Sequence, residues 1–258
     1  MTDIAARAQR LLDLHTAPEL LTVVNVWDAI TAKIVTEVEG TKALATASHS
    51  IAAMYGYEDG ENIPVDLMIE AVGRIAAATD LPVTADLEAG YGNAGETARK
   101  AIDVGIVGAN LEDQVKPLAE AVAAVEAVVK AGEAAGIPFV LNARTDVVAK
   151  AGDRDHDEVI ADAIERGKAF LDVGAPVVFV PGPLSEDDVE KLVGAWGPQK
   201  LTTIGYPGSI PLARQQELGV ARVSYGPFSQ SVALMALQEL AQDIVGGGAL
   251  PADFRVLN

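Results

Sequence analysis

Short apolar, β-branched runs alternate regularly with Ala-, Glu- and Lys-rich stretches along almost the whole chain. Each run has the length of a buried strand, and each stretch between two runs has the spacing of an amphipathic helix. The eight runs are residues 21–26, 43–47, 82–86, 108–112, 138–143, 176–180, 200–204 and 220–224. Eight strand–helix units predict a (β/α)8 barrel (a TIM barrel), with a doubly wound open sheet as the alternative.

The stretches between the runs carry helix start and stop signals. The clearest predicted helices are residues 65–79, 96–104, 118–135, 156–173 and 186–195. Ser185 precedes three acidic residues, which suit the positive end of a helix dipole. The first run leads into Asn25-Val-Trp-Asp28 and not into a glycine-rich phosphate-binding turn, so the barrel is favoured over the open sheet.

Two more helices are predicted outside the barrel repeat. Residues 3–17 form an extra leading helix, and residues 228–245 form a C-terminal helix that begins a tail of about residues 228–258. The sequence contains neither an internal repeat nor a composition typical of a linker. Residues 1–258 are therefore predicted to form a single domain.

Charge and composition argue against several classes of partner. The net charge of −18 repels phosphate backbones, so nucleic acid is not expected as a partner. No apolar run reaches the roughly 18 residues of a membrane span, and the N-terminus lacks the pattern of a signal peptide. A cytoplasmic protein without a membrane partner is therefore expected. The absence of cysteine excludes disulfides, a thiol nucleophile and a thiolate metal site.

The third run ends in two carboxylates, Asp86 and Glu88, followed by Gly90-Tyr-Gly92. Residues i and i+2 of a strand point to the same face, and α/β folds place their chemistry at the carboxyl ends of strands. Two like charges held this close are costly unless a cation or a proton lies between them. The segment therefore predicts a metal or acid–base site.

Other strand ends add oxygen ligands and one cation. Ser48-His-Ser50 and Asp59 follow the second run, Glu112 ends the fourth, and Arg144 follows the fifth. Carboxylates without His or Cys ligands suit a hard cation such as Mg²⁺ or Mn²⁺. The planar fork of Arg144 matches a substrate carboxylate.

Plainer structural roles for these side chains also stay open. Arg144 could pair with Glu112 or Asp113 at the rim of the barrel, Asp59 could cap the next segment, and His49 could pack or form hydrogen bonds.

The ordered set of motifs resembles the isocitrate lyase / phosphoenolpyruvate mutase superfamily. The motifs, which extend from about residue 20 to residue 230, are Asn25-Val-Trp-Asp28, Gly56-Tyr-Glu-Asp59, Asp86-x-Glu-x-Gly-Tyr-Gly92, Leu111-Glu-Asp-Gln114 and Asn142-Ala-Arg144. The resemblance implies a barrel whose final helix is exchanged between subunits of a homodimer or homotetramer. It also implies cleavage or rearrangement of a C–C or P–C bond next to a 2-oxo acid, through a pyruvate-like enolate.

The resemblance implies roles for particular residues. Asp86 would hold Mg²⁺, with Glu88, Glu112 and Asp59 acting largely through water. The expected substrate-binding residues for a small carboxylate are Trp27, Ser48, His49, Ser50 and Arg144, and the catalytic candidates are Arg144, Glu112 and Tyr91. The group that protonates the enolate stays open among Tyr91, Tyr206, His49 and a water on the metal.

The chain also departs from the family pattern. Lyases of the family carry a Lys-x-Cys-Gly-His lid after the strand-four acid, whereas here Glu112-Asp-Gln-Val-Lys-Pro117 runs directly into the next helix. Phe179-Val-Pro-Gly182 and Ile204-Gly-Tyr-Pro-Gly208 replace polar residues after strands six and seven, and the histidine that mutases carry after strand six is missing. The metal-binding half of the site is therefore retained, while the half that reads the rest of the substrate has changed.

The favoured hypothesis is a Mg²⁺-dependent lyase, not a true isocitrate lyase, that acts on a small 2-oxo or 2-hydroxy carboxylate by C–C cleavage or decarboxylation. The alternatives are a mutase or hydrolase of phosphoenolpyruvate or phosphonopyruvate, and a non-catalytic barrel that binds a metabolite.

Overall fold

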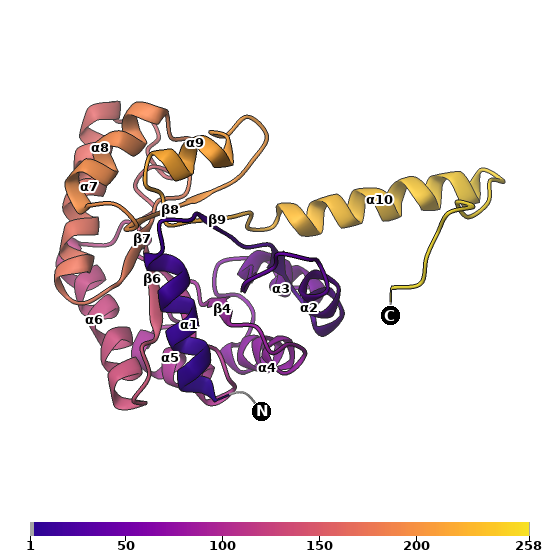
Figure 1. Cartoon of the computed structure of the whole chain (residues 1–258), viewed down its shortest axis with the longest axis horizontal. Helices are drawn as coiled ribbons and strands as arrows, with labels where there is room; N and C mark the ends of the chain where they lie inside the picture. The colour runs from indigo at the N-terminus through magenta and orange to yellow at the C-terminus, as the bar shows by residue number, and fades with distance from the viewer. Residues whose placement is uncertain (1–2, 258) are drawn as a thin grey trace.

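The structure is a computed structural model that describes residues 3–257. In these residues nine strands form one parallel sheet in the order β1-β9-β8-β7-β6-β5-β4-β3-β2. Figure 1 shows the helices that surround it. The strands are β1 (Leu21–Thr22), β2 (Asn25–Val26), β3 (Leu44–Thr46), β4 (Val83–Asp86), β5 (Gly108–Glu112), β6 (Val140–Arg144), β7 (Val177–Phe179), β8 (Leu201–Ile204) and β9 (Arg222–Ser224).

The two ends of this strand order belong to one continuous segment. β1 pairs with β9, and β2, which follows after two residues, pairs with β3. The side chain of Asn25 links both neighbours, because its Nδ2 donates to Thr46 O at 2.8 Å and its Oδ1 accepts from Tyr225 N at 2.8 Å. The predicted TIM-barrel-like fold is therefore confirmed. The first predicted strand is divided in two because it bonds first to β9 and then to β3.

Ten helices surround this sheet in the described residues. They are α1 (Ile4–Thr16), α2 (Ala29–Thr36), α3 (Ser48–Met54), α4 (Val65–Ala77), α5 (Ala94–Asp103), α6 (Leu118–Ala134), α7 (His156–Asp172), α8 (Glu186–Trp196), α9 (Leu212–Glu217) and α10 (Phe228–Val245). The seven helices predicted from sequence are all present, with ends within two residues of the predicted ones. α8 begins where the sequence predicts because Ser185 caps it. Ser185 Oγ accepts from Asp188 N at 3.2 Å, and the Asp188 carboxylate accepts from Ser185 N.

α1 covers the amino-terminal end of the barrel. Its buried Leu11 packs with Leu21, Val23 and Val140, which point into the barrel from the strands. Gly108 makes this close approach possible, because a Cβ there would lie 2.8 Å from Leu11 Cδ2 and 2.7 Å from Val140 O. The extra leading helix therefore closes the end of the barrel that lies opposite the carboxyl ends of the strands.

Polar side chains fill the barrel just below its carboxyl end. Asn142 Nδ2 donates to Asn110 Oδ1 at 2.8 Å, and Thr202 Oγ1 donates to Asn142 Oδ1 at 2.7 Å. Arg222 is fully buried, and burial lowers its pKa to about 10, although the negative charge of Asp86 acts to raise it. These side chains give the functional end of the barrel a polar floor.

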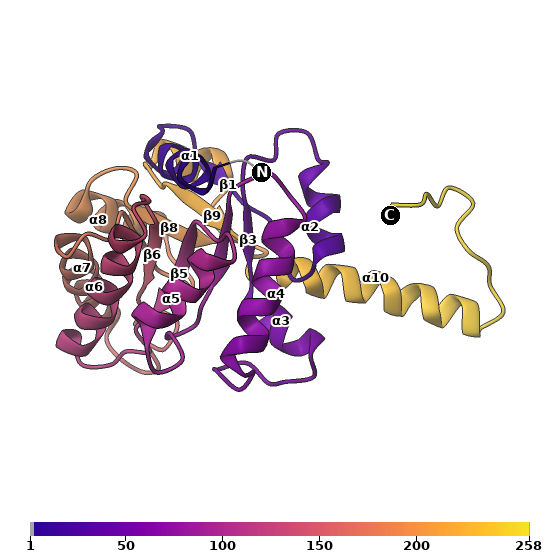
Figure 2. The same ribbon diagram turned by 90° about the horizontal axis from the view of Figure 1, so that it is seen from below.

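α10 leaves the barrel and extends away from it, as Figures 1 and 2 both show. Near its start Gln230 Nε2 donates to Ser50 O at 3.0 Å. Farther along, Val232, Leu234, Met235 and Leu237 are each more than half exposed. The C-terminal helix is therefore present as predicted, and its exchange between subunits stays a prediction.

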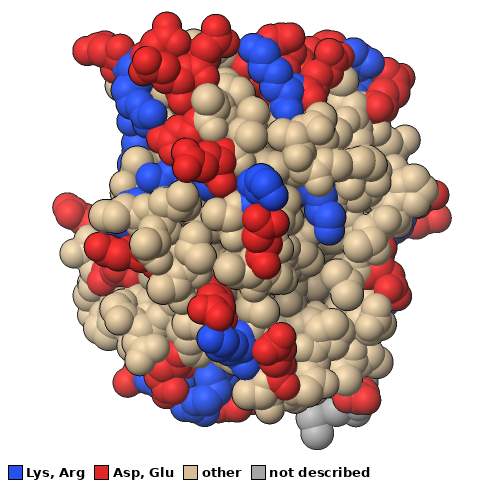
Figure 3. All heavy atoms as spheres, turned by 90° about the vertical axis from the view of Figure 1, so that its left-hand side faces the viewer, with Lys and Arg blue, Asp and Glu red and all other residues tan. Residues whose placement is uncertain are grey.

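Acidic side chains alternate with Lys and Arg on the face of the barrel that Figure 3 shows. Many of these side chains form exposed ion pairs, such as Lys191 with Asp187 at 2.9 Å. Pairs of this kind contribute little to stability individually.

The described part of the chain contains no helix that is both long and apolar enough to cross a membrane.

Candidate active site

A cavity of about 200 Å³ lies at the carboxyl ends of the strands, where barrel enzymes have their active sites. Strand ends and following loops from β2 to β9 all contribute to it. The lining residues are Asn25, Ala47, Ser48, His49, Asp59, Asp86, Asn110, Arg144, Phe179, Pro181, Ile204, Ser224, Gly226 and Pro227. Five of the predicted site residues, Ser48, His49, Asp59, Asp86 and Arg144, therefore line one cavity.

Asp86 is the last residue of β4, and its carboxylate is oriented by the start of α3. Its Oδ2 accepts from Ser48 N at 3.1 Å and from Ser48 Oγ at 2.8 Å. The same hydroxyl lies 3.4 Å from Asp59 Oδ1. Thr46 Oγ1 fixes the backbone by accepting from Asp86 N at 3.0 Å. The strand end and the loop after β3 thus hold two carboxylates beside one hydroxyl.

Glu88 does not line the cavity, because the chain turns directly after β4. Glu88 and Tyr91 both have left-handed backbones, with φ of 51° and 53°. The Glu88 carboxylate accepts from Tyr91 OH at 2.6 Å and from the backbone N–H of Glu61. Gly90 permits this turn, since a Cβ there would lie 2.5 Å from Ala94 Cα. The alternation expected of a strand therefore stops at Asp86.

The turn leaves Glu88 and Tyr91 poorly solvated. Burial raises the pKa of Glu88, and the charges of Asp86 and Asp59 raise it further against its hydrogen bonds from Tyr91 and Glu61. Burial and the carboxylate of Glu88 raise the pKa of Tyr91 far above its usual value. The Tyr91 phenol is therefore a hydrogen-bond donor to Glu88 and a poor source of a proton for a substrate.

Arg144 forms ion pairs with carboxylates on two sides. Its Nη1 lies 3.0 Å from Glu112 Oε2, across the β5–β6 pairing, and its Nε donates to Asp146 Oδ1 at 2.6 Å. Its guanidinium carbon lies 6.0 Å from the ring centre of Phe179, the residue paired with it on β7. Asp146 is completely buried and also pairs with Lys150 at 2.9 Å. Arg144 therefore faces the cavity in a fixed orientation.

Burial and the charge of the ion-pair partner shift the pKa of Glu112 in opposite directions, and the same holds for the pKa of Arg144. Burial raises the pKa of Glu112 to about 7, with help from Asp146 and Asp86 and against the opposing charge of Arg144. Burial disfavours the charged form of Arg144, but Glu112, Asp146 and Asp86 outweigh it and raise the pKa of Arg144. The guanidinium is thus permanently charged, while Glu112 changes its charge near neutral pH.

The carboxylates around Asp86 are oxygen donors of the kind that a hard divalent cation binds. Asp59 and Asp86 line the cavity, whereas Glu88 and Glu112 lie outside its lining. Burial is the main cause of the raised pKa of Glu88 and of Glu112, and repulsion from neighbouring carboxylates adds to it. Within residues 3–257 no three His, Cys, Asp or Glu side chains are arranged to hold an ion together. Mg²⁺ often binds through one or two carboxylates and keeps several waters. This mode of binding is compatible with Asp86 as a direct ligand and with the other acids acting through water.

Several predicted site residues lie outside the cavity lining. Glu112 stands behind Arg144 as its ion-pair partner. Ser50 is buried in α3, and its carbonyl oxygen accepts from Gln230. Trp27 packs at the edge of the hydrophobic cluster around Val26 and Met68. The structure does not bring Ser50 or Trp27 to the cavity, because one points into the body of the protein and the other packs outside the barrel. Tyr206 lines a separate small cavity.

Sequence reasoning missed part of the site. Asp146 orients Arg144 and is separated from it by a single residue. This close spacing of opposite charges in the sequence could have indicated the ion pair. Asn110 forms the floor of the cavity and Ser224 a wall. Both occupy strand-end positions that follow from the barrel register, since Asn110 pairs with Asp86 and Ser224 with Ile204.

The short connection between β5 and α6 is a strained, anchored turn. Gln114 and Val115 have left-handed backbones with φ of 51° and 57°, which is costly for a β-branched residue. Asp113 holds the turn by accepting from Val115 N at 2.9 Å and pairing with the buried Arg166 at 3.0 Å. The loop after β5 is therefore tied down beside the site and does not extend over it.

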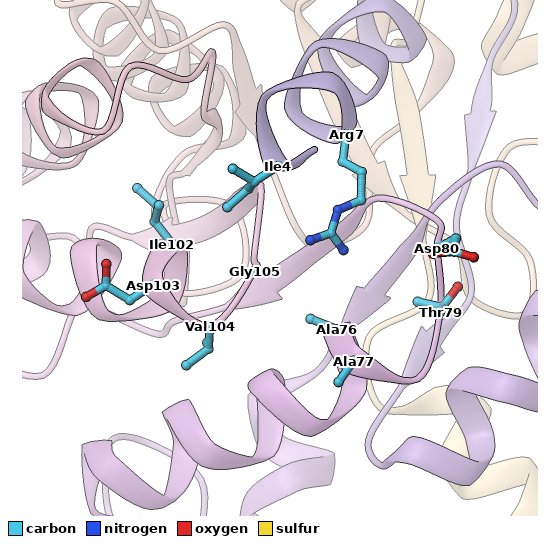
Figure 4. Close-up of a pocket in the computed structure, with 10 residues that line it drawn as sticks. All are labelled: Ile4, Arg7, Ala76, Ala77, Thr79, Asp80, Ile102, Asp103, Val104 and Gly105. Atoms are coloured by element: carbon cyan, nitrogen blue, oxygen red, sulfur yellow. The ribbon is translucent and has the colours of Figure 1, made fainter. Parts of the chain in front are cut away.

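A second cavity, of about 540 Å³, lies at the amino-terminal end of the barrel (Figure 4). In the figure Arg7 reaches from α1 toward Gly105, and the wall is completed by the ends of α4 and α5. Its Asp103 is already paired with Arg99 at 2.6 Å. In barrel enzymes this end serves stability and the carboxyl end serves catalysis. The cavity of about 200 Å³ at the carboxyl end of the barrel is therefore the candidate active site.

Known proteins resemble the chain over most of its length. It is 27% identical to the 2,3-dimethylmalate lyase of Eubacterium barkeri over 82% of the chain and 75% of the relative. It is 27% identical to the oxaloacetate decarboxylase of Paraburkholderia xenovorans over 93% of the chain and 82% of the relative. A crystal structure of a proposed phosphonomutase from Burkholderia cenocepacia superposes with a TM-score of 0.86 and 38% identity, covering 92% of the chain and 99% of the neighbour.

The two curated relatives are named as carbon–carbon lyases, which agrees with the predicted enzyme class. The sequence also matches the family model described as phosphoenolpyruvate phosphomutase over residues 11–245. The resemblance inferred from the five motifs is thus confirmed, and the chain belongs to the phosphoenolpyruvate phosphomutase family within the isocitrate lyase/PEP mutase superfamily.

Proposed function

We propose that the chain is a Mg²⁺-dependent carbon–carbon lyase that converts a small 2-oxo or 2-hydroxy carboxylate through a pyruvate-type enolate. The observation that carries the proposal is that Asp86 and Asp59, held by Ser48, face Arg144 across one small cavity. An anionic ligand needs positive charge in such an acidic site, and Arg144 with a bound cation would supply it. The names of the curated lyase relatives support the same enzyme class.

Asp86 is the residue that would hold the cation directly. The N–H and hydroxyl of Ser48 fix the orientation of its Oδ2, so Oδ1 is the freer oxygen. When bound, Mg²⁺ would polarise the 2-oxo group and stabilise the negative charge of the enolate. Asp59 and Glu112 would accept hydrogen bonds from water around the ion.

Arg144 would bind the substrate carboxylate. Glu112 and Asp146 occupy Nη1 and Nε, and the remaining N–H groups are available to a ligand in the cavity. Because these two carboxylates hold the guanidinium in place, little side-chain entropy is lost on binding. A cavity of about 200 Å³ is below the roughly 300–1,000 Å³ typical of drug-sized ligands, so a substrate of few carbons is expected.

The test is a set of incubations of the purified protein with Mg²⁺ and 2-oxo or 2-hydroxy acids, oxaloacetate and phosphonopyruvate among them. Release of pyruvate that stops with EDTA and in Asp86→Asn would support the lyase. Conversion of phosphonopyruvate alone would support instead a phosphonomutase, the activity named for the Burkholderia neighbour. If oxalate, an enolate mimic, fails to bind in the presence of Mg²⁺, the proposed function is wrong.

We further propose that α10 is exchanged between subunits of a homodimer or homotetramer. The support is the exposed apolar surface on the part of α10 that extends beyond the barrel. Sedimentation should show an oligomer for the native chain and a smaller species for the double variant Leu234→Glu, Leu237→Glu. Gln238→Glu adds charge at an exposed polar position of the same helix and should leave the assembly intact. A native monomer would contradict the exchange.

A further inference from the structure

Three consecutive loops at the carboxyl end of the barrel contain no charged residue. Residues 179–184, 204–211 and 224–230 begin at the last residues of β7, β8 and β9, the third range reaching the first turn of α10, and none of them is Asp, Glu, Lys, Arg or His. In contrast, the segment after β3 supplies Asp59, and β4, β5 and β6 end in Asp86, Glu112 and Arg144. We call the rim formed by β3–β6 the charged half and the rim formed by β7–β9 the uncharged half.

The uncharged half forms one wall of the candidate active site. Phe179, Pro181, Ile204 and Pro227 line the cavity from this side, together with Ser224 and Gly226. Phe179 is almost completely buried, and Ile204 lies beside Ser224 in the β8–β9 register. The wall facing the carboxylates is therefore largely apolar.

The uncharged half also offers few backbone donors. Pro181 and Pro227 have no N–H. The N–H of Phe228, at the start of α10, is used by Tyr225 O at 3.1 Å. The Ser229 hydroxyl donates to Asn25 O at 2.6 Å. A second anionic group on a ligand would thus find no Lys or Arg among the described residues that line this side, where Ser224 contributes a hydroxyl and Arg222 lies fully buried beneath the lining.

Within the part of the chain that the structure describes, Arg144 is the only Lys or Arg that lines the cavity. It lies between Glu112 and Asp146 and faces the charged half, so it can bind one substrate carboxylate at a time. Burying an additional, unpaired carboxylate against Phe179 and Ile204 would cost several kcal/mol in lost hydration. An alkyl group of the same size gains free energy there by leaving water.

We infer that the substrate is a 2-oxo acid with a single carboxylate and a hydroxyl on C4, and that the remaining substituents of C4 are small, uncharged and mainly apolar. Cleavage of the C3–C4 bond then leaves its electron pair on C3 as the enolate of pyruvate, while C4, whose hydroxyl gives up its proton, leaves as an aldehyde or ketone. This inference rests on the proposed function and names the substrate class of the same site. It places the carboxylate and the 2-oxygen at the charged half and an alkyl substituent against Phe179, Pro181 and Ile204.

The test uses two ligands of equal size and different charge. Malate and 2-hydroxy-4-methylpentanoate are isosteric, since a carboxylate in one replaces an isopropyl group in the other. Each is titrated by calorimetry against the native protein with Mg²⁺, in competition with oxalate. The alkyl ligand should bind at least roughly tenfold more tightly. Equal or tighter binding of malate would overturn the inference while leaving the proposed function standing, because oxalate binds in either case. Absence of oxalate binding would overturn the proposed function and this inference with it.

A substitution in the uncharged half should reverse the preference. Ile204→Lys places a cation opposite Arg144 and should shift the ratio of the two dissociation constants at least roughly tenfold toward malate. Ile204→Met, an uncharged change of similar volume, is the matched control and should keep the native ratio. An unchanged ratio in a folded Ile204→Lys variant would contradict the placement of the substituent. The native ligand pair decides the inference even if this variant does not fold.

Discussion

The charged and uncharged halves of the barrel rim are built from the same kind of strand and differ in what those strands end with. Asp86, Glu112 and Arg144 end β4, β5 and β6, whereas Phe179 and Ile204 end β7 and β8. Parallel pairing aligns Arg144 with Glu112 on one side and with Phe179 on the other, while Asp86 is aligned with Asn110. The difference teaches that the barrel supplies position alone. The chemistry is decided by a few side chains at strand ends, and we propose that the charged half anchors the substrate while the uncharged half discriminates between substrates.

The two halves also differ in how they are held together. In the charged half the side chains fix one another through hydrogen bonds and ion pairs, as Arg144 does with Glu112 and Asp146. In the uncharged half, apolar packing holds the side chains in place. Phe179 contributes to both halves because its ring lies under Arg144. Changes in the charged half should therefore affect binding and turnover, and changes in the uncharged half should affect selectivity and stability.

The largest effect is expected at Asp86, where the charged half would hold its cation. Asp86→Asn keeps the shape of the side chain and its hydrogen bonds with Ser48 but removes the charge. Turnover should fall about 10³-fold, and Mg²⁺ binding measured by calorimetry should be lost. Asp103→Asn, an exposed carboxylate at the opposite end of the barrel, is the control and should behave like the native chain. Turnover near the native rate in Asp86→Asn would remove the basis for the metal site.

The second effect is a pH dependence of stability that originates in Glu112. Its pKa rises from 4.5 to about 7 on folding, so between these values the native state binds a proton that the unfolded state does not. Stability of the metal-free protein should therefore fall as pH rises from 4.5 through 7, by on the order of 3 kcal/mol. Urea unfolding at a series of pH values measures this slope.

Glu112→Gln should remove that part of the slope, because it has no proton to lose. Added Mg²⁺ should also flatten the slope if the cation lies in the charged half, since it favours the ionised carboxylate. A native slope that Glu112→Gln leaves unchanged would show that other groups cause the pH dependence.

The third effect concerns the orientation of Arg144. Asp146→Asn keeps a neutral oxygen acceptor for Arg144 but removes a buried charge, so the guanidinium should lose part of its fixed orientation. We expect KM to rise roughly 10-fold to 100-fold with a smaller change in kcat, because a residue that supports a binding group is changed. Asp155→Asn at the exposed start of α7 is a matched control. An equal fall in kcat with unchanged KM would place Asp146 in the chemical step and not in substrate binding.

The smallest effect is expected in the uncharged half. Phe179→Leu retains an apolar wall but leaves a small void under Arg144, which should lower the free energy of unfolding by about 1 kcal/mol. Binding of oxalate should be nearly unchanged, since the charged half is intact. A loss of oxalate binding as large as that in Asp86→Asn would contradict the division of the rim into two halves.

Much of the fold followed from local sequence. The barrel and the ends of seven helices were predictable because hydrophobic periodicity and capping residues such as Ser185 act over a few residues. The site was partly predictable for a related reason, since residues at the carboxyl ends of parallel strands must converge, and Asp86 and Arg144 do. Glu88 was expected to share the face of Asp86, but its left-handed backbone turns it toward Tyr91.

By itself the sequence determined the barrel and the positions of Asp86, Glu112 and Arg144 at strand ends, because each follows from a contiguous stretch or from its spacing. Only the tertiary structure decided that Asp146 grips Arg144, that Trp27 packs away from the cavity, and that Phe179 and Ile204 form one apolar wall. These are distances through space between separate loops. They depend on the closure and register of the barrel, which bring together residues that no local pattern connects.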